Sequence, residues 1–383
     1  MLKGNLYFNL LIVIIRNMKK EVLLIGLLMN IFFATAQFNI SEWKATYQPI
    51  AIQEKLGREA LYCKGGLVYM PSSFFSNGVI EVDILTQVMG GLAFRIDSNL
   101  NYEDVYLRVP KSGAPDALQY GAVFNAEFSW QFYQEYQANV IYPKNEWIHM
   151  KIIVENDQAG VFINNSSTPV LLIDSLRTGN KNGCIGFWSL ADAWFANLQI
   201  RSAAENEKLP KIEKKIIRNE HAIREWLISK PMSYSIESGD LGITLSRQLK
   251  WESAITDPDG YLNINRYAKK NIAGRARNNS SDIVWLKYKW NETSAFDKPF
   301  SFEYSNICFI YFNGKKIFSG NNSFLLKGPL FRGDIDKKMR ANTLFLPTRK
   351  GLNTLLVGVA GVVNGWGFMG QFVDGTKLAY NLQ

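Results

Sequence analysis

The sequence predicts an all-β protein of two antiparallel β-sandwiches, and three observations support this prediction. Apolar and polar side chains alternate strictly in stretches such as residues 79–84, which is the period of a half-buried strand. Turn-forming Gly, Pro, Asn and Asp recur about every ten residues, and no helical pattern is convincing. The length of 383 residues exceeds one typical domain and indicates two.

The first domain is predicted over residues 37–202. After residues 79–84 the alternation returns in several stretches, and a long loop with Pro110 and Gly113 separates two of them. Past this loop a regular strand over residues 128–133 would send Trp130 and Gln131 to opposite faces, and we expect Gln131 on the solvated one. The other expected strands cover residues 92–96, 103–108, 148–155, 161–163, 184–188 and 194–200.

An export leader is predicted over residues 1–36. Met18 and two lysines precede an apolar run that ends in an A-x-A cleavage pattern before Gln37, so the true start is expected at Met18. The run is too short to span a bilayer comfortably, and a two-helix membrane anchor is the alternative. We therefore expect a secreted, periplasmic or cell-surface protein without a stable membrane span after processing.

The two halves differ in charge. Residues 37–202 hold 12 Lys and Arg against 16 Asp and Glu, whereas residues 203–383 hold 27 against 17. A basic half in an exported protein indicates either anionic partners or a solvated face. Nucleic acid is not expected as a partner, because the chain has an export leader and no basic helix or aromatic-basic motif.

The second domain is predicted over residues 225–383, after a charged linker at 203–224. Asn313-Gly314 lies between the stretches 309–312 and 315–318. This dipeptide is the strongest short signal for a β-hairpin, because a type I′ turn needs a positive φ at both of its central residues. A further strand is expected over residues 354–359, followed by Gly365-Trp366-Gly367.

These motifs carry two resemblances. The first domain resembles concanavalin A-like lectin and glucanase sandwiches, including laminin G-like and 3-keto-disaccharide hydrolase-like domains. This resemblance rests on the order F-x-N-G-x-I-E-x-D-I, then G-x-x-F-R, then residues 182–187 and 195–198. The first domain is also similar to a group of uncharacterised exported bacterial proteins. The hairpin at Asn313-Gly314, K-G-x-N and G-W-G-F resemble galactose-binding-like jelly rolls. The resemblances imply a concanavalin A-like sandwich followed by a galactose-binding-like one, and glycan-related binding.

The predicted function is recognition of a poly- or oligosaccharide, neutral or anionic, accessory to polysaccharide use. A pyranose offers apolar C–H faces for stacking and hydroxyls for hydrogen bonds, so rings, amides and guanidiniums on one surface suit it. Arginines would hold hydroxyls or a uronate carboxylate in pairs of hydrogen bonds. The expected ligand-binding residues are Arg95, Tyr106, Arg108, Asp116, Gln119, Tyr120, Asn125, Trp130 and Gln131.

Two other functions stay open. A glycoside hydrolase or keto-sugar hydrolase or lyase would act through strand carboxylates, for which Glu81 and Glu103 are the candidates. Related glucanases carry a second Glu after E-x-D, but this chain has Leu85 and Thr86 there. The third alternative is a non-catalytic structural or adhesion module.

No cofactor is predicted. Asp97, Asn99 and Asn101 place oxygens on alternate residues after a strand, which leaves a structural calcium open. The three cysteines, Cys63, Cys184 and Cys308, have no metal-binding spacing, and the sequence does not decide between free thiols and a disulfide.

Overall fold

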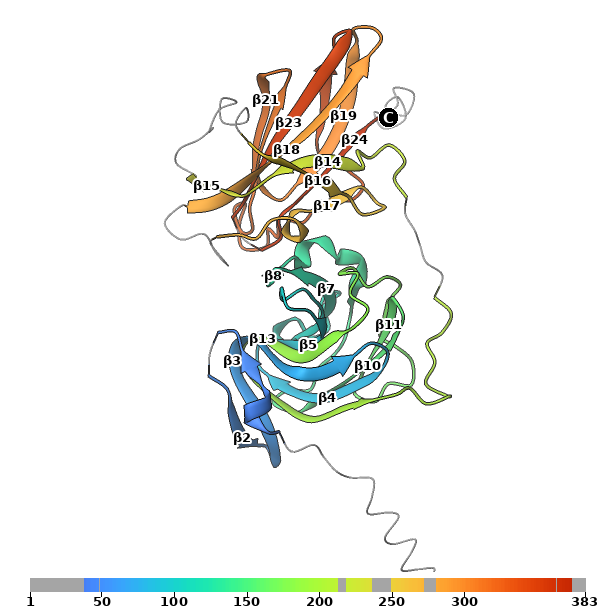
Figure 1. The fold of residues 1–383 in the computed structure, drawn as a ribbon. Helices are drawn as coiled ribbons and strands as arrows, with labels where there is room; N and C mark the ends of the chain where they lie inside the picture. Colours follow the sequence, from blue (N-terminus) through green and yellow to red (C-terminus); the bar gives the residue numbers. More distant parts are fainter. Residues whose placement is uncertain are drawn as a thin grey trace, which may run out of the picture.

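The computed structural model describes residues 38–47, 49–212, 218–235, 249–271, 280–362 and 364–373. These residues form antiparallel strands joined by turns and short 3-10 helices, so the all-β prediction is confirmed (Figure 1). The predicted leader, residues 1–36, lies outside the described residues. Within them, no helix has both the length and the hydropathy to cross a lipid bilayer.

The first part of the chain forms one continuous, strongly curled network of strands, with the order β12-β11-β10-β4-β13-β5-β6-β7-β8. The short 3-10 helices are η1 (Ile40–Glu42), η2 (Val109–Lys111), η3 (Trp130–Phe132) and η4 (Gln134–Tyr136). The strands are β1 (Lys44–Ala45), β2 (Ala51–Lys55), β3 (Arg58–Phe75), β4 (Gly78–Thr86), β5 (Met89–Ile96), β6 (Tyr102–Arg108), β7 (Leu118–Phe124), β8 (Glu127–Phe128), β9 (Gln137–Ala138), β10 (Ile148–Glu155), β11 (Gln158–Ile163), β12 (Leu171–Ile173) and β13 (Gly183–Arg201).

The long strands β3 and β13 turn this network into a sandwich. The first half of β13 pairs with β5 and its second half pairs with β4, while β3 follows it along the other edge. The register of β13 against β3 shifts between Ser189 and Asp192, where the pairing of β13 passes from β5 to β4. One layer therefore contains β12, β11, β10 and β4, and the other contains β5, β6, β7 and β8.

The predicted alternation explains the core between the two layers. Ile80, Val82 and Ile84 of β4 are fully buried in the same cluster as Val105 and Leu107 of β6. Glu81 and Asp83 lie between them in sequence and therefore point to the outer face of their layer. The side-chain period of two thus sets both the apolar core and a polar outer face.

The second part forms two further antiparallel sheets, ordered β16-β14-β18-β23-β20-β21 and β17-β24-β19-β22, with β15 beside β18. The predicted hairpin at Asn313-Gly314 is confirmed, with φ of 47° and 89° at its two turn residues. Their strands are β14 (Glu225–Ser229), β15 (Met232–Ser235), β16 (Trp251–Ile255), β17 (Tyr261–Asn263), β18 (Ser280–Glu292), β19 (Asp297–Tyr304), β20 (Asn306–Phe312), β21 (Lys315–Asn322), β22 (Thr343–Pro347), β23 (Gly351–Gly361) and β24 (Gly367–Phe372), and η6 spans Ile264–Arg266.

The two parts are stacked, and the described residues 202–212 and 218–224, between β13 and β14, run along one side of the molecule (Figure 1). The segment 323–342, between β21 and β22, reaches into the first part, because Ile335 and Met339 are buried in its large core cluster. Lys337 of this segment lies 2.6 Å from a carboxylate oxygen of Glu135. The Nδ2 of Asn125 also donates to the carbonyl oxygen of Asn265 at 2.7 Å. Apolar burial and polar contacts therefore fix the boundary between the parts.

Candidate functional site

A pocket of about 500 Å³ lies at the boundary between the two parts. Both parts contribute to its wall, so the pocket exists only where they meet. The first part supplies Met89, Tyr106, Arg108, Lys111, Asp116, Phe128, Trp130, Trp188 and Leu190, and the second supplies Phe324, Pro329, Leu330, Arg332 and Asn364.

One side of the pocket is a cluster of aromatic rings. The ring centroids of Phe128 and Trp188 lie 4.3 Å apart, and Tyr106 meets both edge-on at 5.4 and 5.5 Å. Trp130 lies farther along the wall, with its centroid 5.7 Å from that of Phe324 in an edge-to-face contact. Phe128, Trp130 and Trp188 are only half-buried. Their exposed ring surface can therefore stack on a flat apolar ligand face.

Two guanidiniums converge on one carboxylate beside these rings. Nη1 of Arg108 and Nη1 of Arg332 each lie 2.6 Å from Oδ2 of Asp116. Burial opposes ionisation of Asp116, but the positive charges of Arg108 and Arg332 lower its pKa below the ordinary value. The carboxylate therefore stays charged and holds both arginines in place.

The same guanidiniums also lie against the rings. The Arg108 guanidinium carbon is 5.2 Å from the Trp130 ring centroid, and that of Arg332 is 4.8 Å from it. Nη2 of Arg108 donates to the Tyr106 hydroxyl at 3.0 Å. Cation–π contacts of this length favour a fixed arrangement of ring and charge. The site thus combines aromatic faces with positive charge.

Local chain geometry explains how Arg108 and Asp116 meet. Strand β6 ends at Arg108, Pro110 lies in η2, and Gly113 adopts a positive φ of 80°, so the chain reverses within a few residues. The backbone N–H of Arg108 donates to the carbonyl oxygen of Ala117 at 2.7 Å, which closes the loop. The predicted turn after Pro110 therefore brings the two side chains together.

Four of the residues that the sequence analysis named for ligand binding line this pocket: Tyr106, Arg108, Asp116 and Trp130. The expectation that Gln131 rather than Trp130 lies on the solvated face was wrong. Strand β8 stops at Phe128 and η3 follows over Trp130–Phe132, so strict alternation does not apply there. Gln131 is 1% exposed and accepts a hydrogen bond from the backbone N–H of Gly365 at 3.0 Å.

The structure places Arg95 away from the pocket. Its side chain is 1% exposed and donates to the carbonyl oxygens of Ser76, Asn156 and Asn180 at 2.6 to 3.1 Å. The backbone at Arg95 has a positive φ of 53°, which breaks the regular alternation of β5. Arg95 therefore holds three loop carbonyls together.

The remaining predicted residues support the site or the core. Gln119 is fully buried and its Nε2 donates to the carbonyl oxygen of Trp130 at 2.7 Å, which helps to fix the pocket loop. Asn125 bonds to Asn265 at the boundary, as described above. The Tyr120 hydroxyl donates to Glu103 at 2.6 Å inside the first core. These three side chains do not line the pocket.

The two candidate catalytic carboxylates lie on different faces. Glu103 is fully buried, accepts from Tyr120 and from the backbone N–H of Thr178 at 3.1 Å, and has a pKa raised by burial. Glu81 lies on the outer face of β4, where a hydrogen bond from His149 and the charge of Arg201 lower its pKa. Because neither lines the pocket, the two cannot flank one glycosidic bond there.

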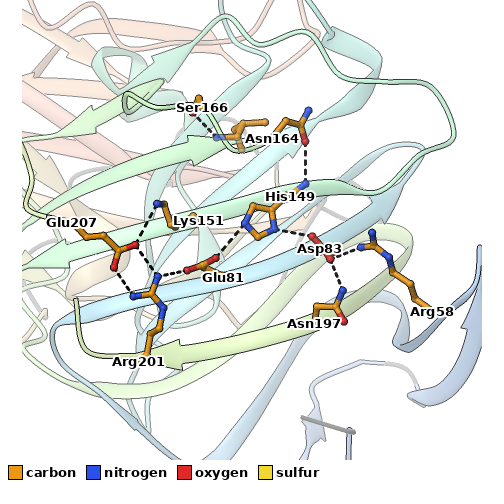
Figure 2. A network of polar contacts seen from close by, with 11 residues as sticks. Arg58, Glu81, Asp83, His149, Lys151, Asn164, Ser166, Asn197, Arg201 and Glu207 are labelled. Carbon is orange, nitrogen blue, oxygen red and sulfur yellow. Dashed lines mark hydrogen bonds and ion pairs between the residues drawn. The ribbon is translucent and has the colours of Figure 1, made fainter. Parts of the chain in front are cut away.

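Glu81 belongs to a polar network on the outer face of β4, β10 and β13 (Figure 2). His149 lies between Glu81 and Asp83, with its Nδ1 2.8 Å from Asp83 Oδ1 and its Nε2 3.4 Å from Glu81 Oε2. Arg201 bridges Glu81 to Glu207, at 2.5 Å from each. This role of His149 could not be predicted from alternation alone, because its position beside Asp83 depends on the register of β10 against β4.

The network predicts a pH dependence of stability. Hydrogen bonds with Asp83 and Glu81 raise the pKa of His149 to about 9. Because the pKa of His149 is higher in the folded protein than in the unfolded chain, its protonation stabilises the fold. This contribution is complete below pH 6.5, the pKa in the unfolded chain, and is lost as the pH rises through about 9. We expect the free energy of unfolding to fall by about 2 kcal/mol over this interval, after a discount for partial exposure.

Urea unfolding of the wild type and of His149→Gln at several pH values tests this expectation. The variant lacks the titrating group, so the decline between pH 6.5 and 9 should be smaller in it than in the wild type by the stated amount. Equal declines in both proteins would show that the network does not contribute through His149.

The possible calcium ligands are engaged within their own loop. Oδ1 of Asp97 accepts from the backbone N–H groups of Asn99 and Asn101 at 2.8 and 2.9 Å, and Oδ2 accepts from Asn101 Nδ2 at 2.8 Å. No group of three or more His, Cys, Asp or Glu side chains suited to a metal ion occurs among the described residues. Cys63, Cys184 and Cys308 are free thiols.

The contribution of the second part to the pocket could not be predicted from the sequence. Arg332 and Phe324 lie in the segment between β21 and β22, which carries no regular pattern, and Arg332 meets Asp116 across 216 positions of sequence. Trp188 was recognised only as part of a strand. Its half-buried position opposite Phe128 depends on the packing of β8 against β13, which no local pattern reveals.

No model of a known protein family matches the chain, and no curated protein matches it. Among solved structures, a carbohydrate-binding module of Bacillus subtilis is 18% identical, with 41% of this chain and 93% of the module covered and a TM-score of 0.32. A family 16 endo-glucanase of Bacteroides ovatus is 8% identical (44% and 98% covered, TM-score 0.30). A galectin of Caenorhabditis elegans is 10% identical (43% and 99% covered, TM-score 0.25). Likenesses this distant carry no conclusion about ligand or activity.

Proposed function

We propose that this protein is an exported carbohydrate-binding protein and that the pocket between its two parts binds a poly- or oligosaccharide, neutral or anionic. The observation that carries the proposal is the meeting of half-buried Phe128, Trp130 and Trp188 with the charged Arg108 and Asp116 in one pocket. Sugars need both kinds of surface, because their C–H faces stack on rings and their hydroxyls bond to charged and polar groups.

The pocket volume supports a small saccharide segment as the ligand. A volume of about 500 Å³ falls within the range of small-molecule sites, which is roughly 300 to 1,000 Å³. Leu190 and Leu330 at its wall are 56% and 89% exposed, so the pocket opens to solvent where a longer chain would continue. Export follows from the predicted leader and suits a protein that meets polysaccharides outside the cell.

Binding is favoured over hydrolysis by the state of the carboxylates. Asp116 is the carboxylate that lines the pocket, and its pKa is lowered. It already forms ion pairs with Arg108 and Arg332. A general acid needs a carboxyl that is protonated near neutral pH. Glu81 has a lowered pKa, and Glu103 is enclosed in the core. The groups at the pocket therefore suit recognition.

Trp130→Ala should abolish retention of the protein in affinity gels that contain its polysaccharide. Removing a central ring from a binding pocket typically costs about 2 kcal/mol, which weakens the Kd roughly 30-fold. The experiment runs the full chain through gels of neutral and acidic polysaccharides and compares migration with a gel that lacks polysaccharide.

Trp194→Ala is the matched control. Trp194 is half-buried on β13 outside the pocket, where its Nε1 donates to Gln53 at 2.8 Å. The control should be retained like the wild type, and melting curves confirm that both variants fold. If the wild type is retarded by no polysaccharide, or if both variants lose retention equally, the pocket does not bind saccharide.

A further inference from the structure

We propose that the pocket selects saccharides carrying an anionic group, a carboxylate or a sulfate, and that Arg332 of the second part is the residue that sets this specificity. The inference rests on the proposed function, because it names the ligand class of the same pocket. Three observations support it: the net positive charge of the pocket wall, the guanidinium N–H groups that lack acceptors, and the fact that Arg108 comes from the first part and Arg332 from the second.

The charge balance at the wall is positive. Arg108, Arg332 and Lys111 line the pocket, against the single carboxylate of Asp116. Asp334 also pairs with Arg332, its Oδ2 lying 3.1 Å from Nε, but it is not part of the lining. One positive charge therefore remains after both carboxylates are counted. Arg108 is 6% exposed, and a cation so poorly hydrated gains more from a nearby anion than one in water does.

The guanidiniums of Arg108 and Arg332 each have a nitrogen whose N–H forms no hydrogen bond with any described residue. Nε of Arg108 and Nη2 of Arg332 are enclosed and have no hydrogen-bond partner. Enclosed donors without acceptors are unfavourable, so a ligand that supplies an acceptor gains affinity. The Arg332 side chain is 29% exposed, which leaves it room to turn toward such an acceptor. Carboxylates and sulfates offer paired oxygens that match the guanidinium fork.

The arrangement around Trp130 explains why the anion should be attached to a sugar. Both guanidinium carbons lie about 5 Å from the Trp130 ring centroid, at 5.2 and 4.8 Å. A ring stacked on Trp130 would thus hold a substituent within reach of either arginine. Stacking alone accepts neutral sugars, whereas stacking beside two guanidiniums favours acidic ones.

Selection requires both parts of the chain. Arg108 and Trp130 belong to the first part, while Arg332 arrives on the segment 323–342, which is anchored by Ile335 and Met339. The first part alone keeps most of the rings but lacks this guanidinium. Arg332 is therefore a specificity residue that the first part alone cannot supply.

Calorimetric titration of the full chain with three sets of oligosaccharides of matched length tests the inference. Oligogalacturonate carries carboxylates, carrageenan oligosaccharides carry sulfates, and malto-oligosaccharides are neutral. We expect at least one acidic set to bind, and its affinity should fall at high salt. The neutral set should bind at least about 10-fold more weakly than that acidic set. The acidic set that binds more tightly identifies the anionic group.

Arg332→Gln should weaken acidic binding about 10- to 100-fold and neutral binding much less, so the ratio of acidic to neutral affinity should fall. Arg340→Gln is the control, because Arg340 lies on the same segment, is 72% exposed and pairs with Asp336. Asp116→Asn should have the opposite effect on acidic binding. It removes the carboxylate that pairs with Arg108 and Arg332, so acidic saccharides should bind more tightly.

Two results would overturn the inference: neutral sugars that bind as tightly as acidic ones, or an Arg332→Gln variant with unchanged acidic binding. If Trp130→Ala still abolishes binding in either case, the proposed function survives and only the charge selection fails. If none of the three sets binds the wild type, the saccharide proposal itself fails.

Discussion

Arg95→Ala should destabilise the first part by about 4 kcal/mol without a direct effect on the pocket. The side chain is 1% exposed and satisfies the carbonyl oxygens of Ser76, Asn156 and Asn180. Truncation leaves these acceptors without their donor, and each buried unsatisfied group costs about 1 to 3 kcal/mol. Urea unfolding followed by tryptophan fluorescence measures the change.

Arg340→Ala is the matched control for Arg95→Ala, because its 72% exposed side chain makes a surface ion pair, and its removal should leave the urea midpoint close to that of the wild type. Saccharide titration of the folded Arg95 variant separates the two roles that this residue was given. A variant with wild-type stability and lost binding would return Arg95 to the ligand site, as the sequence analysis expected.

Ile335→Asp should release the segment 323–342 from the first part and dismantle the pocket. Ile335 is 2% exposed inside the core cluster, and an aspartate there would carry an unpaired charge into apolar surroundings. We expect a loss of about 4 kcal/mol in the free energy of unfolding and cleavage within this segment by a protease that leaves the wild type intact. Time courses of limited proteolysis measure the release.

Leu326→Asp provides the comparison on the same segment, since Leu326 is 52% exposed and the change should alter stability by less than about 0.5 kcal/mol. Release of the segment also removes Arg332, so Ile335→Asp should lose saccharide binding. Equal protease sensitivity of the two variants would mean that Ile335 does not anchor the segment.

Side-chain alternation predicted several of the strands and part of the candidate site. It identified β4, β10 and the hairpin of β20 and β21, and it grouped Tyr106 with Arg108 on one face of β6. Turn chemistry then led to Asp116, because Pro110 and Gly113 reverse the chain. These features depend on residues close in sequence.

Alternation failed where the backbone is irregular or where distant segments meet. The positive φ of Arg95 turns its side chain into the loops, and η3 reverses the expected roles of Trp130 and Gln131. The polar network around His149 required the register between β10 and β4. Arg332 joins Asp116 only through the packing of segment 323–342, which no local pattern encodes.

A crystal structure of the full chain with an acidic oligosaccharide tests the central claim most directly. We expect a sugar ring against Trp130, with its carboxylate or sulfate oxygens within hydrogen-bonding distance of Arg108 or Arg332. A ligand bound elsewhere, for example on the outer face beside His149, with the pocket left free, would contradict the assignment of the site.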